Sequence, residues 1–267
     1  MKYRLVGSEM CIRDSIDEPT IAVSPIKFNK KHISLRPMDK PSRSERARLW
    51  GLEEGRVFLN HGSFGATPTA VRKEQRTWQD LMENEPVRFF EDLMPGILER
   101  TRAALAKQLS CQADDLALVE NATSGVNTVL RSLVFERGDE ILVPDHAYQA
   151  CRNTIDFVAE RWGATVVTVN IPFPIEHADQ ALNAVMDGVT ERTRLAMIDT
   201  VTSPTGLLMP YERMVTQLEE RGVHVLLDAA HGIGMIPLNL DELGASSVSY
   251  THLTLPTKQM GKMSVVG

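Results

Sequence analysis

The sequence predicts an α/β fold, a mostly parallel sheet with helices on both faces. Short apolar runs alternate with helical stretches along most of the 267 residues. Strands that alternate with helices favour βαβ crossovers, which place neighbouring strands parallel. Several apolar runs end in polar residues, and ligands of such sheets bind beyond the carboxyl ends of the strands. The fold class therefore also predicts where a functional site lies.

The composition is that of an ordinary globular protein, with 43% hydrophobic and 24% charged residues. The formal net charge of −6 disfavours a general affinity for nucleic acid. No apolar run approaches the roughly 20 residues of a membrane span, and the charged first residues lack the apolar core of a signal peptide. The three cysteines are too dispersed for a disulfide framework or a zinc site. We therefore expect a cytoplasmic protein with no nucleic-acid or membrane partner.

The first part of the chain, residues 1–44, holds several prolines and no periodic apolar face, so we expect an irregular lead-in. Structured sequence begins at about residue 45. Thr67 and Pro68 predict a helix start, with a hydroxyl N-cap and a proline at the first helical position. A second helix is expected from Pro86 to Leu109, with a bend near Pro95.

Five apolar runs of strand length follow, each separated from the next by a helical stretch. The expected strands are LALV from Leu116, EILVP from Glu140, TVVTVN from Thr165, LAMIDT from Leu195 and HVLLDA from His224. The expected helices cover residues 124–135, 147–162, 176–189 and 210–221.

The segment ENATSGVNTVL after the first of these runs places small and hydroxyl residues where a helix begins. A helix N-terminus has free N–H groups and the positive end of the dipole, so Thr123 and Ser124 are candidates for holding a phosphate group. The alternative is a plain N-cap by either hydroxyl. The glycine pattern of a P-loop or of a dinucleotide fingerprint is absent.

Three further strand ends carry polar side chains. His146 and Tyr148 follow EILVP and are candidates for stacking on a ring or carrying protons, although surface loop residues look the same. Ser203 lies in a VTSPTG segment that also fits a simple Ser-Pro turn. HVLLDA ends in Asp228, with His231 on the turn after it. A carboxylate at the end of a buried strand is costly without a cation beside it, so Asp228 predicts a positively charged partner.

Three other kinds of site fit the pattern less well. His224, Asp228 and His231 suggest a metal site, but His224 and Asp228 lie at opposite ends of one strand, more than about 10 Å apart. A serine hydrolase is disfavoured because the G-x-S-x-G turn is absent. An enzyme that uses a nucleotide is the third alternative, and the missing glycine fingerprints count against it.

The phrases FLNHGSFGATP, ENATSGVNTVL, GDEILVPDHAYQACRN, TRLAMIDTVTSPTGLLMP and VLLDAAHGIGMIPLNLDELGA resemble the class V aminotransferase family. This family belongs to the fold-type-I enzymes that use pyridoxal 5'-phosphate (PLP), and the likeness is to its isopenicillin N epimerase-like and cysteine desulfurase-like branch. It covers about residues 45–245. The resemblance implies the major PLP-binding domain of fold type I, in incomplete form.

The resemblance also implies roles for the polar strand ends. Asp228 would pair with the protonated pyridine nitrogen of PLP, and Ala122, Thr123 and Ser124 would hold its phosphate. The ring that stacks on the pyridine would be Tyr148 rather than His146. Ser203 and His231 would approach the phenolic oxygen. Asn60 and His61 resemble a substrate-facing segment.

One expected residue of the family is out of place. A lysine that bonds covalently to PLP normally follows the aspartate by roughly 26 residues. Thr254 occupies that position, and Lys258 is the nearest candidate. Residues 247–267 do not resemble the family. The strings GSEMCIRDS and SYTHLTLPTK resemble the ends of unrelated translated environmental assemblies, so we expect residues 1–15 and 247–267 to be artefactual and the domain, residues 45–246, to be truncated at its C-terminal side.

The resemblance implies a PLP-dependent enzyme that acts on a small amino acid or amine as an epimerase, transaminase, desulfurase or lyase. The parent protein is expected to be a homodimer and this chain an inactive fragment. The alternative is a non-catalytic PLP-binding or partly folded protein. Cys111 and Cys151 precede the site and are poor candidates for a desulfurase nucleophile.

Overall fold

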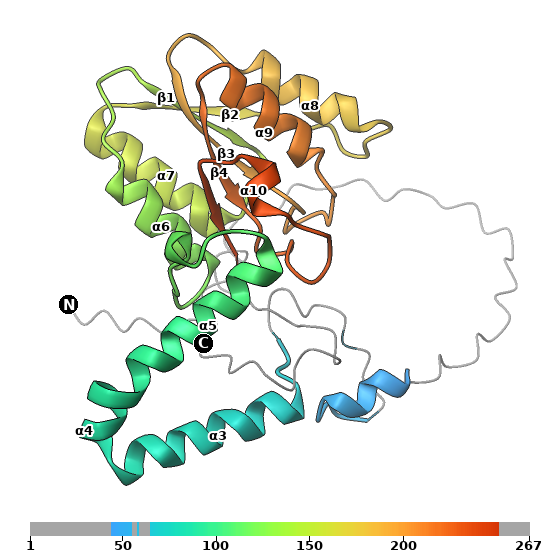
Figure 1. Cartoon of the computed structure of the whole chain (residues 1–267). Helices are drawn as coiled ribbons and strands as arrows, with labels where there is room; N and C mark the ends of the chain where they lie inside the picture. Colours follow the sequence, from blue (N-terminus) through green and yellow to red (C-terminus); the bar gives the residue numbers. More distant parts are fainter. Residues whose placement is uncertain (1–43, 55–57, 59–64, 251–267) are drawn as a thin grey trace, which may run out of the picture. The chain divides into compact units, whose positions relative to one another are not determined.

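A computed structural model describes residues 44–54, 58 and 65–250 of the chain (Figure 1). The chain divides into two compact units, residues 1–44 and 45–267, and the second contains all the helices and strands described below. Asn60, His61 and Lys258 lie outside the described residues. In the described part, no helix is long and apolar enough to cross a membrane.

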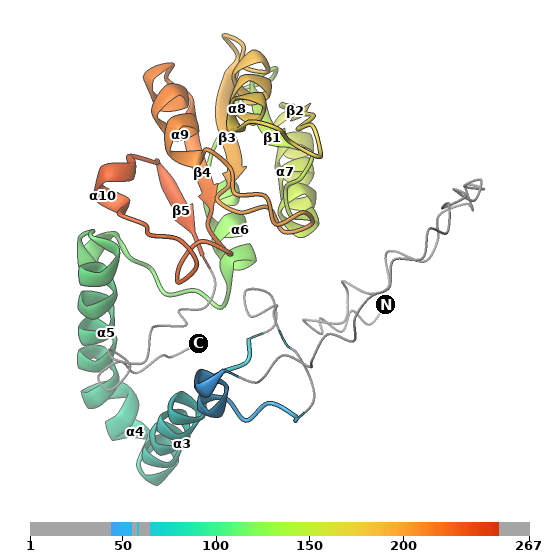
Figure 2. The same cartoon turned by 90° about the vertical axis from the view of Figure 1, so that its right-hand side faces the viewer.

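The core of the unit is a sheet of five described strands, all parallel, and this confirms the predicted mostly parallel sheet although not every predicted strand. Its spatial order is β2-β1-β3-β4-β5 (Figure 2). The strands are β1 (Glu140–Pro144), β2 (Thr165–Val169), β3 (Thr193–Asp199), β4 (His224–Asp228) and β5 (Ser247–Ser249). The chain moves from β1 to β2 and then returns past β1 to β3. The order of the sheet therefore reverses between β1 and β3, which is where ligands of such sheets bind.

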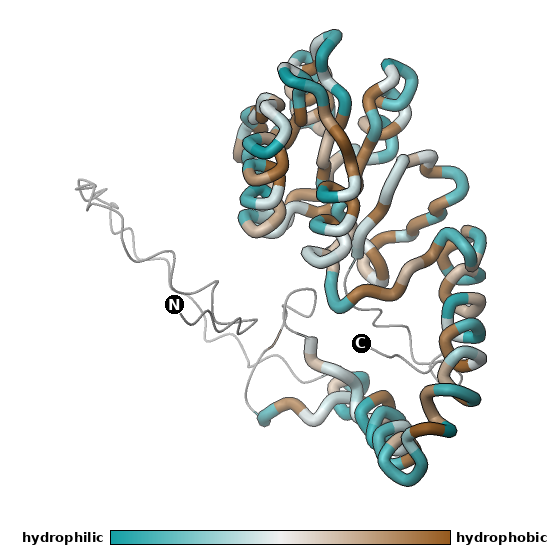
Figure 3. The backbone as a smooth tube through the Cα atoms, turned by 90° about the vertical axis from the view of Figure 1, so that its left-hand side faces the viewer, coloured by the Kyte–Doolittle hydropathy of each residue, from teal (hydrophilic) through white to brown (hydrophobic). Residues whose placement is uncertain are grey.

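Helices cover both faces of the sheet. The helices are α6 (Ala122–Ser132), α7 (Gln149–Trp162), α8 (Ala178–Asp187), α9 (Tyr211–Glu220) and the short α10 (Leu240–Leu243). Buried side chains of α6 and α7 pack with one set of strand residues, and those of α8 and α9 pack with the alternate set. Because both faces are covered, the central strands β1, β3 and β4 are largely buried apolar runs, and much of the sheet is brown in Figure 3.

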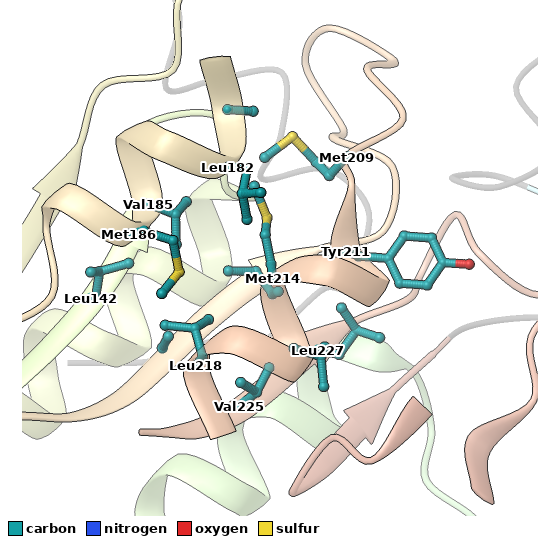
Figure 4. Close-up of a cluster of buried hydrophobic side chains, with 14 of the residues drawn as sticks. Leu142, Leu182, Val185, Met186, Met209, Tyr211, Met214, Leu218, Val225 and Leu227 are labelled. Carbon is teal, nitrogen blue, oxygen red and sulfur yellow. The ribbon is translucent and has the colours of Figure 1, made fainter. Parts of the chain in front are cut away.

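The larger of the two apolar clusters lies between the sheet and α8 and α9 (Figure 4). Met214 and Leu218 of α9 are fully buried against Leu142 and Leu227 of the sheet. Each such side chain contributes about 1.5–3 kcal/mol relative to exposure. This face holds the strands in place but carries none of the candidate site residues.

The N-terminal helices differ in detail from expectation. Helix α3 (Thr69–Asn84) begins one residue late, with Pro68 at the N-cap position and no side-chain cap, so the predicted Thr67 cap is wrong. The second helix consists of α4 (Pro86–Arg88), a π-helical turn η2 (Phe89–Leu93) and α5 (Met94–Leu109). The irregular turn thus precedes Pro95, whose missing N–H cannot continue the helical ladder.

The predicted strand from Leu116 to Val119 is wrong. A 3₁₀ turn, η3 (Ala113–Asp115), precedes it, and residues 116–119 form no strand. Leu118 and Val119 are 41% and 42% exposed, so a short apolar run was not a sufficient signal for a buried strand. Sequence reasoning also missed β5, because Ser-Val-Ser has no apolar pattern. Its three residues pair with Leu226, Leu227 and Asp228 of β4.

A buried acid at the amino end of the sheet accepts hydrogen bonds at both of its carboxylate oxygens. Glu140, the first residue of β1, is 4% exposed and accepts hydrogen bonds from the hydroxyls of Thr190 and Thr193. Arg192 Nε and Nη2 donate to its Oε1 at 3.2 and 3.0 Å. The Thr190 hydrogen bond is the largest contribution to lowering the pKa of Glu140, ahead of Arg192, although burial opposes it. Glu140 therefore joins β1 to the start of β3.

We expect Glu140→Gln to lower the free energy of unfolding by about 1–3 kcal/mol at pH 7, because Arg192 and two hydroxyls lose a charged acceptor. A lowered native pKa gives stability that is present above the unfolded pKa of about 4.3 and is lost as the pH falls through the native pKa. The difference between the two proteins should therefore shrink below about pH 4. Urea unfolding at several pH values measures it, with Glu160→Gln on the exposed side of α7 as the control. An equal loss in both variants would contradict the assignment.

Candidate functional site

The candidate site lies at the carboxyl ends of β1, β3 and β4. The last residues of β3 and β4, Asp199 and Asp228, are register partners in the parallel pair. The loop after β1 carries His146, and the loop after β3 carries Thr205. The N-terminus of α6 and the first turn of α7 face the same end, since Thr123 and Cys151 contact each other and Cys151 contacts Asp228.

Asp228 is a buried acid, 4% exposed, with two hydrogen-bond donors. The Ala230 backbone N–H donates to Oδ1 at 3.0 Å, and the Cys151 thiol donates to Oδ2 at 3.6 Å. Burial raises the pKa of Asp228, although Ala230, Cys151 and the charge of His231 oppose this. Among the residues that the structure describes, no lysine or arginine forms an ion pair with it. The site therefore holds an acid that lacks a strong cationic partner.

Cys151 contacts both Thr123 of α6 and Asp228 of β4. It lies in the first turn of α7, is fully buried, and packs in the cluster between the sheet and α6 and α7. Burial is the main cause that raises its pKa, followed by the charge of Asp228, while a hydrogen bond with Thr123 opposes the rise. The thiol thus stays protonated and joins the first turn of α6 to the Asp228 carboxyl group.

The first turn of α6 contains the three predicted phosphate-holding residues. The helix begins at Ala122, two residues earlier than expected, so Ala122, Thr123 and Ser124 all lie in its first turn. Its N-cap is Asn121, whose Oδ1 accepts from the Ser124 backbone N–H at 2.8 Å. The alternative of a plain cap by Thr123 or Ser124 is therefore wrong. A Cβ added at Gly125 would clash with Ser249, so the turn also requires a residue without a side chain.

The two candidate rings after β1 occupy different places. The Nδ1 atom of His146 is 3.2 Å from the Thr205 hydroxyl, so the loops after β1 and β3 meet where the strand order reverses. The His146 ring lies edge-on to Phe173, with centroids 5.9 Å apart. Tyr148 is the N-cap residue of α7 and packs against the α6 and α7 cluster. The choice of Tyr148 as the stacking ring stays a prediction.

Ser203 and His231 lie on the loops after β3 and β4. Ser203 is exposed, and the loop is shaped by the neighbouring Thr202, whose hydroxyl is 2.6 Å from that of Thr205. His231 is partly buried and close enough to Asp228 for its charge to act on that carboxyl group. Their approach to a phenolic oxygen stays a prediction.

Sequence reasoning missed Asp199 and the site role of Cys151. Asp199 is 3% exposed, and within the part of the chain that the structure describes its Oδ2 has no hydrogen-bond partner. The available signal was the one that identified Asp228, an acid closing an apolar strand, since LAMID and HVLLD end alike. No local signal marked Cys151, because its contact with Asp228 joins residues 77 apart in sequence.

These residues fit a phosphorylated aromatic cation. Asp228 is a buried acid without a lysine or arginine partner in the described residues, and α6 directs its N-terminal dipole to the same end of the sheet. His146 and Tyr148 lie on the loop after β1, at this end. In the described part of the chain, no cluster of His, Cys, Asp and Glu suits a metal ion. The arrangement is that of an α/β enzyme domain with an organic cofactor.

The chain belongs to the aminotransferase class-V family, whose model matches residues 69–251. Members of this family are PLP-dependent enzymes. A putative L-cysteine desulfhydrase 1 of Oryza sativa subsp. japonica is 36% identical over 75% of this chain and 45% of its own length. The isopenicillin N epimerase of Streptomyces clavuligerus is 32% identical over 70% of this chain and 47% of its own. The chain thus spans about half the length of the curated relatives it matches.

Solved structures show the same fold. The cystine C–S lyase C-DES, in complex with its product cysteine persulfide, superposes with a TM-score of 0.70 at 22% identity, over 74% of this chain and 53% of its own. The Escherichia coli cysteine desulfurase CsdA gives 0.64 at 21% identity, over 77% and 52%. The predicted fold class, a fold-type-I PLP domain, is confirmed.

We expect Cys151 to resist thiol reagents in the native chain, because only the thiolate reacts and burial keeps the group protonated. Its modification should be much slower than that of the partly exposed Cys111 and should become as fast once urea unfolds the chain. Timed alkylation with peptide mapping measures both rates, and Cys111→Ser is the control. Equal rates in native protein would contradict the buried link to Asp228.

Proposed function

We propose that this chain is the cofactor-binding part of a PLP-dependent lyase that cleaves a carbon–sulfur bond in a small sulfur-containing amino acid. The observation that carries the cofactor is Asp228, a buried acid with a raised pKa and no lysine or arginine partner in the described residues. The relatives support the reaction class, since they include L-cysteine desulfhydrases and a hercynylcysteine sulfoxide lyase.

Different residues would hold different parts of the cofactor. Asp228 would hold the proton on the pyridine nitrogen, because a buried carboxylate stabilises a cation in direct contact. The first turn of α6, with Ala122, Thr123 and Ser124, would hold the phosphate. When bound, PLP supplies an electron sink for charge that develops at the amino acid's α-carbon. Tyr148 or His146 would cover the ring.

The two cysteines in the described residues are poorly suited to a desulfurase, which carries sulfur on its own thiol. Such a thiol must be mobile and ionisable. Cys151 is fully buried and donates to Asp228, and burial together with Asp241 and Asp115 raises the pKa of Cys111. Neither of these two thiols suits that role. Epimerase chemistry is the second candidate, because the S. clavuligerus epimerase is 32% identical.

The site also favours a second copy of the chain beside it. Exposed apolar side chains occur on three loops at the same end of the sheet, after β2, β3 and β4. They are Phe173, Leu208 and Met235, exposed by 60%, 56% and 61%. Exposed apolar residues on several loops at one end of a sheet favour burial in an interface. We propose that the whole enzyme is a homodimer that covers this end.

We expect PLP to bind the wild-type chain and Asp228→Asn to weaken that binding about tenfold or more, because the amide cannot offset the ring's charge. The same change should raise the unfolding midpoint of the cofactor-free chain, since it removes a buried acid without a strong partner while keeping an acceptor for Ala230. Absorbance titration and thermal unfolding measure the two effects. Asp156→Asn, on the exposed side of α7, should change neither.

Whether a lysine of this chain bonds covalently to PLP has a separate test. We expect no lysine of this chain to be labelled selectively when PLP is added and the mixture is reduced with borohydride, because position 254 is Thr. Peptide mapping of the reduced protein shows where the label sits. A single label on Lys258 would identify an active divergent enzyme and would contradict the expected inactivity.

A further inference from the structure

Asp199 and Asp228 form a pair of acids at the end of the sheet. Asp199 closes β3, Asp228 closes β4, and the two are register partners in parallel strands. Register partners in adjacent parallel strands point to the same face. That face is the one covered by α6 and α7, because Met197 and Leu226, two residues earlier in each strand, pack in that cluster. Both acids are buried, at 3% and 4% exposure.

The groups around the pair include no lysine or arginine ion pair in the described residues. From α7 the neutral thiol of Cys151 contacts Asp228, and from the loop after β4 the charge of His231 acts on Asp228. On the loop after β1, Asp145 accepts from the Ile171 N–H and the Asn170 amide. Its only ion pair in the described chain is a 3.9 Å approach to His146. Helix α6 contributes the uncharged Thr123.

We propose that Asp199 is a positioning residue of the cofactor site, which keeps its proton and so leaves Asp228 as the single anion that meets a ring cation. Its Oδ2 has no hydrogen-bond partner among the described residues, a situation that costs far less for a neutral acid than for a carboxylate. One ring brings one positive charge, and two buried carboxylates side by side would leave one charge unbalanced. The identity of the ring rests on the function proposed above, whereas the proton on Asp199 does not.

The electrostatics of the pair agree with this assignment. Burial and then the charge of Asp228 raise the pKa of Asp199 well above its ordinary value. Asp228 accepts from the Ala230 N–H and the Cys151 thiol, which favour its ionised form, whereas Oδ2 of Asp199 has no donor among the described residues. Two titratable groups with unlike surroundings separate in pKa, and the one with hydrogen-bond donors ionises first.

The first test follows the stability of the cofactor-free chain against pH. A native pKa above the unfolded value of about 3.9 gives stability that is full below that value and is lost as the pH rises towards the native pKa. We therefore expect Asp199→Asn to unfold less readily than the wild type at pH 8. The ratio of their folding equilibrium constants should grow with pH, by at most about tenfold per unit. A ratio that stays constant from pH 5 to pH 8, as expected for Asp156→Asn, would overturn the proposal.

A second measurement keeps the proposal testable if Asp199→Asn folds poorly. The infrared spectrum of the wild type at pH 7 should contain the carbonyl band of a protonated carboxylic acid, lost in Asp199→Asn or in the smaller Asp199→Ser. The band should remain in Asp156→Asn and in Asp228→Asn. Its absence from the wild type, or its loss only in Asp228→Asn, would place the proton elsewhere and overturn the assignment.

The third test separates this proposal from the proposed function. PLP should bind Asp199→Asn within about threefold of the wild type, because a neutral group replaces a neutral group, while Asp228→Asn binds far more weakly. Equal weakening in both variants would make Asp199 a second anion and overturn the proposal. If PLP binds none of the proteins, the proposed function fails, and the pH profile and infrared band still decide the state of Asp199.

Discussion

The arrangement of the site depends on one constraint, the burial of an acid at the end of β4 with no lysine or arginine among the described residues to neutralise it. Asp228 is held by a backbone N–H and by a thiol, both of which stabilise a carboxylate only weakly compared with a salt bridge. Cys151 extends this hold to the first turn of α6. The carboxyl group of Asp228 and the first turn of α6 are therefore linked through one thiol.

Much of the fold was predictable because buried parallel strands leave strong local signals. EILVP and HVLLDA mark β1 and β4 correctly, since strands covered on both faces are continuous apolar runs. The two wrong strand assignments arise where a local apolar run does not match membership of the sheet. LALV is apolar but remains outside the sheet, and β5 joins it with only one apolar residue in three. In both cases contacts with distant parts of the chain determine whether the segment joins the sheet, and the local sequence does not specify those contacts.

The site was predictable only in part. Asp228 and the first turn of α6 follow from strand ends and helix starts, and the sequence places them without knowledge of contacts. The thiol of Cys151 and the second acid, Asp199, become meaningful only when β3, β4 and α7 come together. The choice of stacking ring also depends on tertiary contacts. His146 and Tyr148 are two residues apart, and only their side-chain environments distinguish them.

The buried acids at the two ends of the sheet differ in their hydrogen-bond and charge partners. At the amino end Glu140 has an arginine and two hydroxyls, so that end is complete in the chain alone. At the carboxyl end Asp199 and Asp228 have no such partners among the described residues. A ligand that binds only the folded form raises its stability by mass action. The cofactor proposed for this end would therefore stabilise the folded chain and make it more resistant to proteolysis than the cofactor-free chain.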